Sequence, residues 1–222
     1  MSRIVLKLGG RVAATAAAEA LELRAQGHDV VVVHGAGPQI TAEMERRGIV
    51  PTFVDGRRVT TTEVLHVVRG SLAEVNGVVC AAIGPSAVSF FGDAIGLPAT
   101  QVEALGLVGH PVPSAPPPVE EALAAGLIPV IAPLATGPLN VNADEAAAAL
   151  AIGLGAERIV FVSDVPGVLL DGHVVERIAV DDAVRMLGDS TFEGGIVPKL
   201  EAAVMATRGG VRASIGSTEV VA

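Results

Sequence analysis

The sequence predicts an α/β protein of three layers, αβα, in which a mainly parallel, doubly wound open sheet lies between two layers of helices. Two observations predict this fold class. Apolar runs rich in valine and isoleucine alternate with amphipathic segments along the 222 residues, and strands buried on both faces have this composition. Hydrophobic residues make up 50% of the chain but aromatic residues only 2%, so aliphatic side chains must build the core. A chain of this length forms one domain or two closely joined lobes.

The first half of the chain begins the alternation of strands and helices. The expected elements are a strand over 4–8, a helix through Leu21 and Leu23, a strand over 30–33, a helix from Pro38, a hairpin over 49–60 and a helix over 61–83. Pro51 and Gly56 punctuate the hairpin, and apolar residues recur at helical spacing in the segment after it. From 84 to 118 the pattern weakens into short strands and turns, and we expect a surface excursion there.

The second half resumes the alternation. The expected elements are a helix near 119–125, a strand over 128–131, a helix over 142–154, a strand over 159–162, a hairpin around Asp171 and Gly172, helices near 179–188 and 195–208, and a strand pair over 211–221. Residues 122–143 carry no charge and are long enough to span a membrane. Because Pro129, Pro133 and Pro138 would break a spanning helix, we expect a helix end, a buried strand and a turn instead, and no membrane segment.

Charge and cysteine content exclude several classes of partner and site. The 15 lysines and arginines are outnumbered by 24 acidic residues, giving a formal charge of −9, which argues against a nucleic-acid partner. Cys80 is the only cysteine, so neither an intramolecular disulfide nor a cysteine-based zinc site can form. We therefore expect a cytoplasmic protein that holds anionic substrates with local positive groups.

Glycine-containing segments follow the first two strands. Residues 7–10, Lys-Leu-Gly-Gly, can form an anion-binding turn with a lysine beside it, or a plain strand-ending turn with a solvated lysine. They lack the longer loop of P-loop enzymes. Residues 34–39, His-Gly-Ala-Gly-Pro-Gln, open a helix whose N-terminus suits a carboxylate, without the third glycine of a dinucleotide fingerprint. We expect His34 to be a hydrogen-bonded residue that fixes this loop rather than a catalytic one.

Arg57 and Arg58 are adjacent in the expected hairpin. Side chains alternate along a strand, so the two guanidinium groups should point to opposite faces. One can then clamp a carboxylate bidentately while the other stays solvated. A pair of ordinary surface arginines is the alternative.

Polar residues gather where the strand before the alanine-rich helix ends. Asn140, Asn142 and Asp144 stand at this junction, and either asparagine can cap the helix while Asp144 interacts with its dipole. Two amides and an acid exceed what capping requires. We therefore expect Asp144 also to orient lysines or to act through the water shell of a metal ion.

Two more segments in the second half lie at positions that suit a ligand. Residues 163–168 follow the carboxyl end of a strand, where open α/β sheets bind ligands, and either receive a nucleoside or form a plain turn. Residues 193–200 place a glycine pair before a helix and Lys199 in its opening turn, within reach of phosphates.

Taken together and in this order, these segments resemble the amino-acid kinase family, and within it the acetylglutamate kinases. The resemblance covers nearly the whole chain and is carried by KLGG at 7–10, HGAGPQ at 34–39, GRRVT at 56–60, NVNADEAAAALA at 140–151, FVSDVPGVL at 161–169 and GGIVPKL at 194–200. It implies the amino-acid kinase fold, similar to that of carbamate kinase, with an acceptor-binding lobe over 1–135 and a nucleotide-binding lobe over 136–222.

The resemblance implies a role for each candidate residue. Lys7 and Lys199 would stabilise the phosphoryl group in transit, and Asp144 would hold the two lysines in position. The acceptor-binding residues would be Ala36, Gly37, Arg58 and Asn140. The nucleotide-binding residues would be Gly9, Gly10, Asp164, Val165, Gly167 and Gly194. Mg²⁺ would accompany ATP, and no metal site made by protein side chains is implied.

The implied reaction is attack by the γ-carboxylate of N-acetylglutamate on the γ-phosphate of ATP, a step of arginine biosynthesis. A carboxylate is deprotonated at neutral pH, so no general base is needed. Two alternatives remain: a kinase for carrier-protein-linked glutamate or aminoadipate, and an inactive paralogue that binds ATP or an amino acid and regulates a partner. The chain has Ala36 where the family usually has a third glycine. It starts at the first strand, without the extra N-terminal helix of arginine-inhibited members, so we expect a homodimer rather than an arginine-sensitive hexamer.

Overall fold

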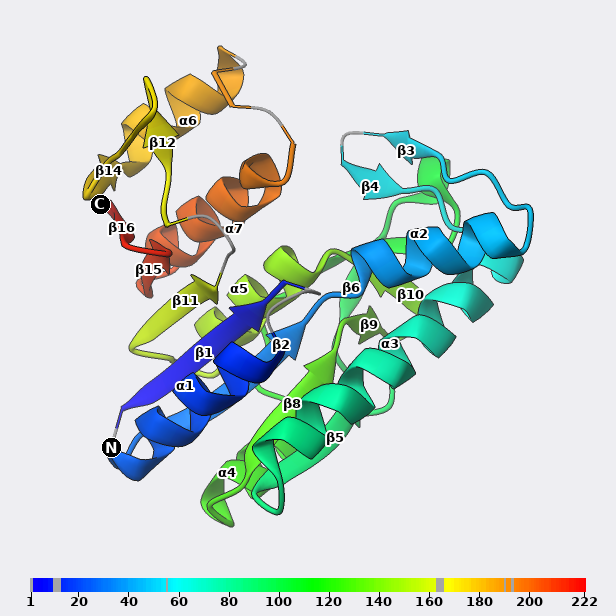
Figure 1. The fold of residues 1–222 in the computed structure, drawn as a ribbon, viewed down its shortest axis with the longest axis horizontal. Coiled ribbons are helices and arrows are strands. Elements are labelled where there is room, and N and C mark those ends of the chain that lie inside the picture. The colour runs from blue at the N-terminus through cyan, green and yellow to red at the C-terminus, as the bar shows by residue number, and fades with distance from the viewer. Residues whose placement is uncertain (1, 10–12, 55, 163–165, 190, 193) are drawn as a thin grey trace.

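The structure is a computed structural model that describes residues 2–222 except 10–12, 55, 163–165, 190 and 193. Within the described residues, eight strands form a central sheet in the order β14-β16-β15-β11-β1-β2-β8-β5 (Figure 1). They are β1 (Arg3–Leu8), β2 (Asp29–His34), β5 (Ala87–Phe91), β8 (Ile128–Ala132), β11 (Arg158–Val162), β14 (Arg177–Ala179), β15 (Arg212–Ile215) and β16 (Thr218–Val221). Neighbouring strands are parallel except for β15 and β16, so the predicted mainly parallel sheet is confirmed.

Helices cover both faces of the sheet. The helices are α1 (Ala13–Ala25), α2 (Gly37–Arg46), α3 (Thr62–Ile83), α4 (Pro117–Ala124), α5 (Ala143–Gly153), α6 (Val180–Gly188) and α7 (Ile196–Arg208). In β1, Leu6 packs in one apolar core with residues of α1, α2 and α3, whereas Val5 packs in a second core with residues of α4 to α7. Because side chains alternate across a strand, these two cores are the two faces of the sheet, and the three-layer prediction is confirmed.

Helix α3 is long and apolar enough to cross a membrane by length and composition, and it is the single such helix in the part of the chain described. Half of its most apolar stretch of 18 residues is buried inside the protein. The helix packs against β5, β8 and the helices α1 and α2. Its buried residues Val68, Leu72 and Val79 lie in the core. The helix therefore has the burial of a core helix of a globular domain.

Residues 84–118 differ from the surface excursion we expected. They supply β5 to the central sheet, the short helical turn η1 (Glu103–Leu105), and two strands of a second sheet ordered β6-β7-β10-β9. The four strands of the second sheet are β6 (Ala99–Gln101), β7 (Val108–Pro111), β9 (Leu134–Ala135) and β10 (Leu139–Val141). Leu97 and Val108 are buried in this region. These four strands are too short for a period to appear in the sequence, and β7 pairs with β10, which is remote from it in the sequence.

Two hairpins complete the fold. Strands β3 (Phe53–Val54) and β4 (Arg57–Arg58) pair in the first, and β12 (Leu169–Leu170) and β13 (His173–Val174) in the second. Asp171 and Gly172 both have positive φ, of 50° and 79°, as a two-residue hairpin turn requires, so the hairpin predicted there is confirmed. The β3–β4 hairpin projects from one side of the fold, and α6 and α7 lie on the other (Figure 1).

Helix α5 brings its polar first turn to the end of the central sheet. Asn142 is the N-cap, and its Oδ1 accepts hydrogen bonds from the backbone N–H groups of Asp144 (2.8 Å) and Glu145 (3.3 Å). The alanines from Ala146 to Ala149 are fully buried, because their small side chains let the helix axis approach the sheet. The predicted helix and cap are thus confirmed, and the next residues of the turn face the ends of β1 and β2.

Candidate active site

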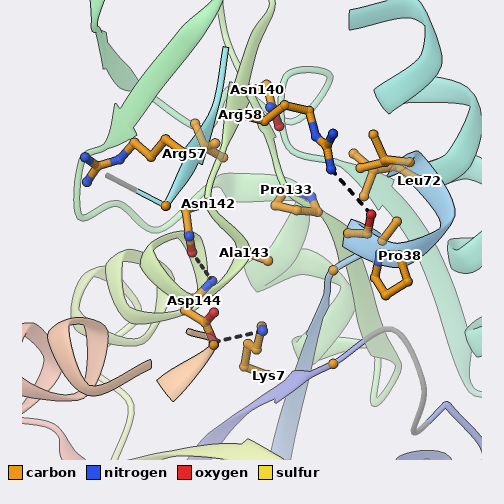
Figure 2. Close-up of a pocket in the computed structure, with 18 of the residues that line it drawn as sticks. Lys7, Pro38, Arg57, Arg58, Leu72, Pro133, Asn140, Asn142, Ala143 and Asp144 are labelled. Atoms are coloured by element: carbon orange, nitrogen blue, oxygen red, sulfur yellow. Dashed lines mark hydrogen bonds and ion pairs between the residues drawn. The ribbon is translucent and has the colours of Figure 1, made fainter. Parts of the chain in front are cut away.

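A cavity of about 460 Å³ opens at the carboxyl ends of β1 and β2, between the β3–β4 hairpin and the start of α7. This is the edge of an open α/β sheet where ligands bind. Figure 2 shows Lys7 and Asp144 at one end of the cavity and Arg58 and Asn140 at the other. Eight of the residues predicted for the site line it: Lys7, Gly9, Ala36, Gly37, Arg58, Asn140, Asp144 and Lys199.

Lys7, Asp144 and Lys199 form a cluster at one end of the cavity. Lys7 Nζ lies 2.8 Å from Asp144 Oδ1, and Lys199 Nζ lies 3.9 Å from Asp144 Oδ2. Lys7 and Asp144 are buried. One carboxylate therefore contacts two cations that come from β1 and from the opening turn of α7, as the sequence predicted for Asp144.

Burial sets the protonation of Lys7. Removing the ammonium group from water lowers the pKa of Lys7, and the positive charge of Lys199 lowers it further. The negative charge of Asp144 acts in the opposite direction and raises the pKa of Lys7. Asp144 therefore favours the charged form of a lysine that burial alone would tend to neutralise.

Several glycines line the cavity. Gly9, Gly37 and Gly195 line it, and a Cβ atom added to any of them would meet no atom of the described residues within 4 Å. The packing of the protein does not require glycine at these positions, so the missing side chains leave room for a ligand to approach the backbone. Lys199 Nζ donates to the carbonyl oxygen of Gly195 at 3.2 Å, which places this lysine over the α7 end of the cavity.

Arg58 lies at the other end of the cavity and is buried. Its Nη2 donates to Thr41 Oγ1 at 2.8 Å and, at 3.5 Å, to the carbonyl oxygen of Gly37. Its guanidinium carbon is 4.6 Å from the centroid of the Phe53 ring, a cation–π contact. Burial lowers the pKa of Arg58, but an arginine remains charged at neutral pH.

A chain of hydrogen bonds joins Asn140 to Arg58. Asn140 Nδ2 donates to Thr60 Oγ1 at 3.0 Å, and Thr60 Oγ1 donates to the carbonyl oxygen of Arg58 at 2.8 Å. Thr60 is completely buried. Thr60 is not among the residues predicted for the site, although it belongs to the GRRVT segment that contributed to the resemblance.

The structure corrects one expectation about the two arginines. Arg57 and Arg58 extend in opposite directions, as strand alternation predicts (Figure 2). Arg57 does not stay solvated, because its Nη2 lies 2.6 Å from Glu145 Oε1 in the first turn of α5. Its partner is remote in the sequence, so no local pattern could reveal the pair.

His34 has the structural surroundings that the sequence analysis favoured. It is buried at the end of β2, and its Nε2 lies 3.0 Å from Asn76 Nδ2 of α3. The amide nitrogen is a donor, so Nε2 accepts and the ring is neutral with its proton on Nδ1. Burial lowers the pKa of His34 to about 4, and the nearby charge of Lys7 also lowers it. His34 is not among the residues that line the cavity within the described chain.

The remaining predicted residues divide into two groups. Gly10, Asp164 and Val165 lie outside the described residues. Gly167 and Gly194 are described but do not line the cavity. A Cβ on Gly167 would come within 2.6 Å of Thr218 Oγ1, so packing against β16 accounts for this glycine. Gly194 has a φ of +67°, a conformation that favours glycine at the turn before α7.

The described residues contain no group of three or more His, Cys, Asp or Glu side chains placed to bind a metal ion. Asp144 is the one described acidic residue lining the cavity, and it is paired with lysines. The described side chains thus form no cage for a metal ion.

A cavity of this kind can bring two anions together while cancelling their charge. Two lysines and open backbone stand at one end, and a buried arginine with an amide stands at the other. Phosphoryl transfer needs this combination of positioning and charge stabilisation. The fold and the site together define the class of the protein as an α/β phosphotransferase.

Comparison with known proteins identifies the family. The model of the "Amino acid kinase family" matches residues 2–217, and the chain belongs to this family. It is 39% identical over 243 residues to the acetylglutamate kinase of Acidothermus cellulolyticus, covering 95% of this chain and 81% of that protein. It is 36% identical over 246 residues to the acetylglutamate kinase of Gluconobacter oxydans, covering 96% and 82%.

Solved structures share the fold. The smu.665 protein of Streptococcus mutans UA159 superposes with a TM-score of 0.90 at 27% identity, covering 99% of this chain and 98% of that chain. Carbamate kinase from Giardia lamblia, bound to citric acid, superposes with a TM-score of 0.72 at 14% identity over 99% and 98%. The predicted amino-acid kinase fold, similar to that of carbamate kinase, is confirmed.

Proposed function

We propose that the protein is an acetylglutamate kinase, which transfers the γ-phosphate of ATP to the γ-carboxylate of N-acetyl-L-glutamate. The products are N-acetyl-L-glutamyl 5-phosphate and ADP, in arginine biosynthesis in the cytoplasm. The observation that carries this proposal is the cluster of Lys7, Asp144 and Lys199 facing Arg58 across one cavity. The relatives named acetylglutamate kinase, at 36% and 39% identity over nearly the whole chain, support the choice of acceptor.

The chemistry requires positioning more than proton transfer. A carboxylate oxygen of the acceptor forms a bond to the γ-phosphorus, the bond from this phosphorus to the β,γ-bridging oxygen breaks, and ADP leaves with the electron pair. The acceptor is already ionised at neutral pH, so no residue needs to remove a proton. The main cost is bringing two anions into line, and Lys7 and Lys199 lower it by stabilising charge on the transferring group.

Asp144 orients the two lysines in this proposal. Its two carboxylate oxygens lie near different lysines, at 2.8 and 3.9 Å, so it fixes their separation as well as their charge. Its own negative charge would repel a phosphate, but the paired lysines give the cluster a net charge of about +1. We infer that Asp144 acts through the lysines and touches neither substrate.

The nucleotide would bind mainly to the 136–222 lobe, and the acceptor mainly to the 1–135 lobe. Open backbone at Gly9 and Gly195 supports binding of phosphate oxygens by N–H groups. Mg²⁺ carried on these phosphates supplies further positive charge. Gly10, Gly194 and the segment from Asp164 to Gly167 remain proposed for the nucleotide by resemblance, and a homodimer remains the proposed assembly.

The acceptor would bind between Arg58, Asn140 and the loop at Ala36 and Gly37. The planar guanidinium of Arg58 can hold a carboxylate with two parallel hydrogen bonds, and the amide of Asn140 can read the acetamido group. Arg58 is pre-positioned for this by Thr41 and by the Phe53 ring. Because its partners in the structure are neutral, the charge of Arg58 is available to an anionic acceptor.

The test is formation of an acyl phosphate that depends on ATP and Mg²⁺, trapped as a hydroxamate. N-acetylglutamate should be strongly preferred over glutamate, aspartate and N-acetylaspartate. Glutamate carries an ammonium group that would oppose the cationic site. Absence of turnover with all four acceptors would overturn the proposal and favour a carrier-linked acceptor or an inactive regulatory paralogue.

A further inference from the structure

The first turn of α5 makes a second ionic contact, next to the one that orients the lysines. Glu145 follows Asp144 in the chain, and its Oε1 lies 2.6 Å from Arg57 Nη2 in the β3–β4 hairpin. The side chains of Arg57 and Glu145 are only 23% and 13% exposed. Consecutive residues of one helical turn thus contact two different parts of the cavity: Asp144 the lysines, and Glu145 the hairpin.

His110 completes the surroundings of Glu145. Its Nδ1 lies 3.2 Å from Glu145 Oε2 and 3.3 Å from Arg57 Nη2. Both carboxylate oxygens of Glu145 are therefore engaged, one by the hairpin and one by β7. The three side chains come from the hairpin, the second sheet and α5, so their contacts join three elements at the rim of the cavity.

The hairpin has little apolar burial of its own to fix its position. Phe53 is 52% exposed and Val54 44% exposed. Arg58 anchors one side of β4 to α2 through Thr41, and Arg57 anchors the opposite side to α5. The hairpin is thus held between two helices by adjacent arginines that point in opposite directions (Figure 2).

We propose that Arg57 and Glu145 are positioning residues for the acceptor, because their ion pair ties the hairpin that carries Arg58 to the helical turn that carries Asp144. This inference rests on the proposed function and deepens it. Arg58 would hold the acceptor, and Asp144 orients the lysines that meet the phosphoryl group. The tie between Arg57 and Glu145 sets the spacing between these two ends of the cavity.

The ion pair between Arg57 and Glu145 affects binding of the acceptor more than binding of ATP. The guanidinium group of Arg57 is already occupied by Glu145, so it is not needed as a direct ligand of the acceptor. Loss of the pair leaves Arg58 present but lets the hairpin move, which weakens acceptor binding. The open glycines and the two lysines are not part of the hairpin, so ATP binding should change little.

Steady-state kinetics of Arg57→Gln, Glu145→Gln and the double variant test this proposal. Each single change should raise the KM for N-acetylglutamate about tenfold, a size that fits loss of one partly buried ion pair, with the KM for ATP within about twofold of wild type. The double variant should be no worse than the single ones, because both changes remove the same contact. The charge-swapped variant Arg57→Glu with Glu145→Arg should recover part of the loss.

Arg177→Gln provides a matched control. Arg177 Nε pairs with Glu219 Oε2 at 3.1 Å, but these side chains are 73% and 57% exposed and lie on β14 and β16, away from the cavity. This change should leave both KM values unaltered. An unchanged acceptor KM in Arg57→Gln, or equal losses for acceptor and ATP, would overturn the proposal.

Hydrogen exchange gives a readout that does not depend on turnover. The amides of Val59 and Thr60 donate to the carbonyl oxygens of Thr52 and Leu105, and they report on the hairpin. Their exchange should accelerate in Arg57→Gln and Glu145→Gln but not in Arg177→Gln. Unaltered exchange in both Arg57→Gln and Glu145→Gln would refute the role of this ion pair in holding the hairpin. An inactive wild-type protein would instead refute the proposed function, and hydrogen exchange would still decide whether the tie exists.

Discussion

The burial of His34 should make the stability of the folded protein depend on pH in a way that can be calculated. Its pKa is about 4 in the folded protein, against 6.5 for a histidine in the unfolded chain. Between these values the unfolded chain binds a proton at His34 and the folded protein does not. Stability is therefore lost as the pH falls from about 6.5 towards 4, and is fully present above this window.

The size of the effect follows from the difference in pKa. Lowering the pKa from 6.5 to about 4 corresponds to about 3 kcal/mol of unfolding free energy at low pH, and to about 2.5 kcal/mol at pH 4.5. In His34→Gln this dependence disappears, while the glutamine amide oxygen can still accept the hydrogen bond from Asn76. The variant should therefore lose about 2 kcal/mol less stability than wild type between pH 7 and pH 4.5.

Urea unfolding at pH 7 and pH 4.5 measures this difference. The carboxylates titrate in both proteins, so their contribution cancels when the two losses of unfolding free energy are compared. His173→Gln is the control, because His173 is exposed in β13. Between pH 7 and pH 4.5 this variant should lose as much stability as wild type. Equal losses in wild type and His34→Gln would refute the assignment of His34 as a buried neutral histidine.

Three further predictions concern the cavity. Asp144→Asn removes the charge that raises the pKa of Lys7, so in the residual activity the alkaline limb of the kcat/KM profile should move to lower pH; an unmoved limb would contradict the role of Asp144. Gly9→Ala adds a methyl group that meets no atom of the described residues within 4 Å, so the free energy of unfolding should stay within about 1 kcal/mol of wild type while the KM for ATP rises at least about tenfold. An unaltered KM for ATP would show that the ligand does not approach Gly9. Lys199→Gln should lower kcat by about 10²- to 10³-fold with little change in melting temperature, and a wild-type kcat would remove Lys199 from the mechanism.

Much of the fold could be predicted because its central strands are buried on both faces. The valine run that forms β2 and the alanine-rich α5 leave clear patterns, since burial in a parallel sheet demands continuous apolar residues. The turn at Asp171 and Gly172 was also predictable, because few residues adopt positive φ. The second sheet was not, because β9 and β10 have two and three residues and the pairing of β10 with β7 is non-local.

The candidate site was predictable from the sequence where residues stand at strand and helix ends. Lys7, Asn140 and Lys199 occupy such positions, and parallel strands bring their carboxyl ends to one edge of the sheet. Side-chain pairs across the fold had no such signal. The contacts of Arg57 with Glu145 and of His34 with Asn76 depend on the packing of α5 and α3, and only the structure reveals them.

The measurement that tests the central claim most directly is ³¹P nuclear magnetic resonance of the protein with MgATP and N-acetylglutamate. The proposed mechanism predicts that the signal of the ATP γ-phosphate declines as an acyl-phosphate signal grows in equal amount, and that Lys199→Gln slows both changes together. Release of inorganic phosphate without an acyl-phosphate intermediate, even when the product is trapped promptly, would contradict transfer to a carboxylate at this site.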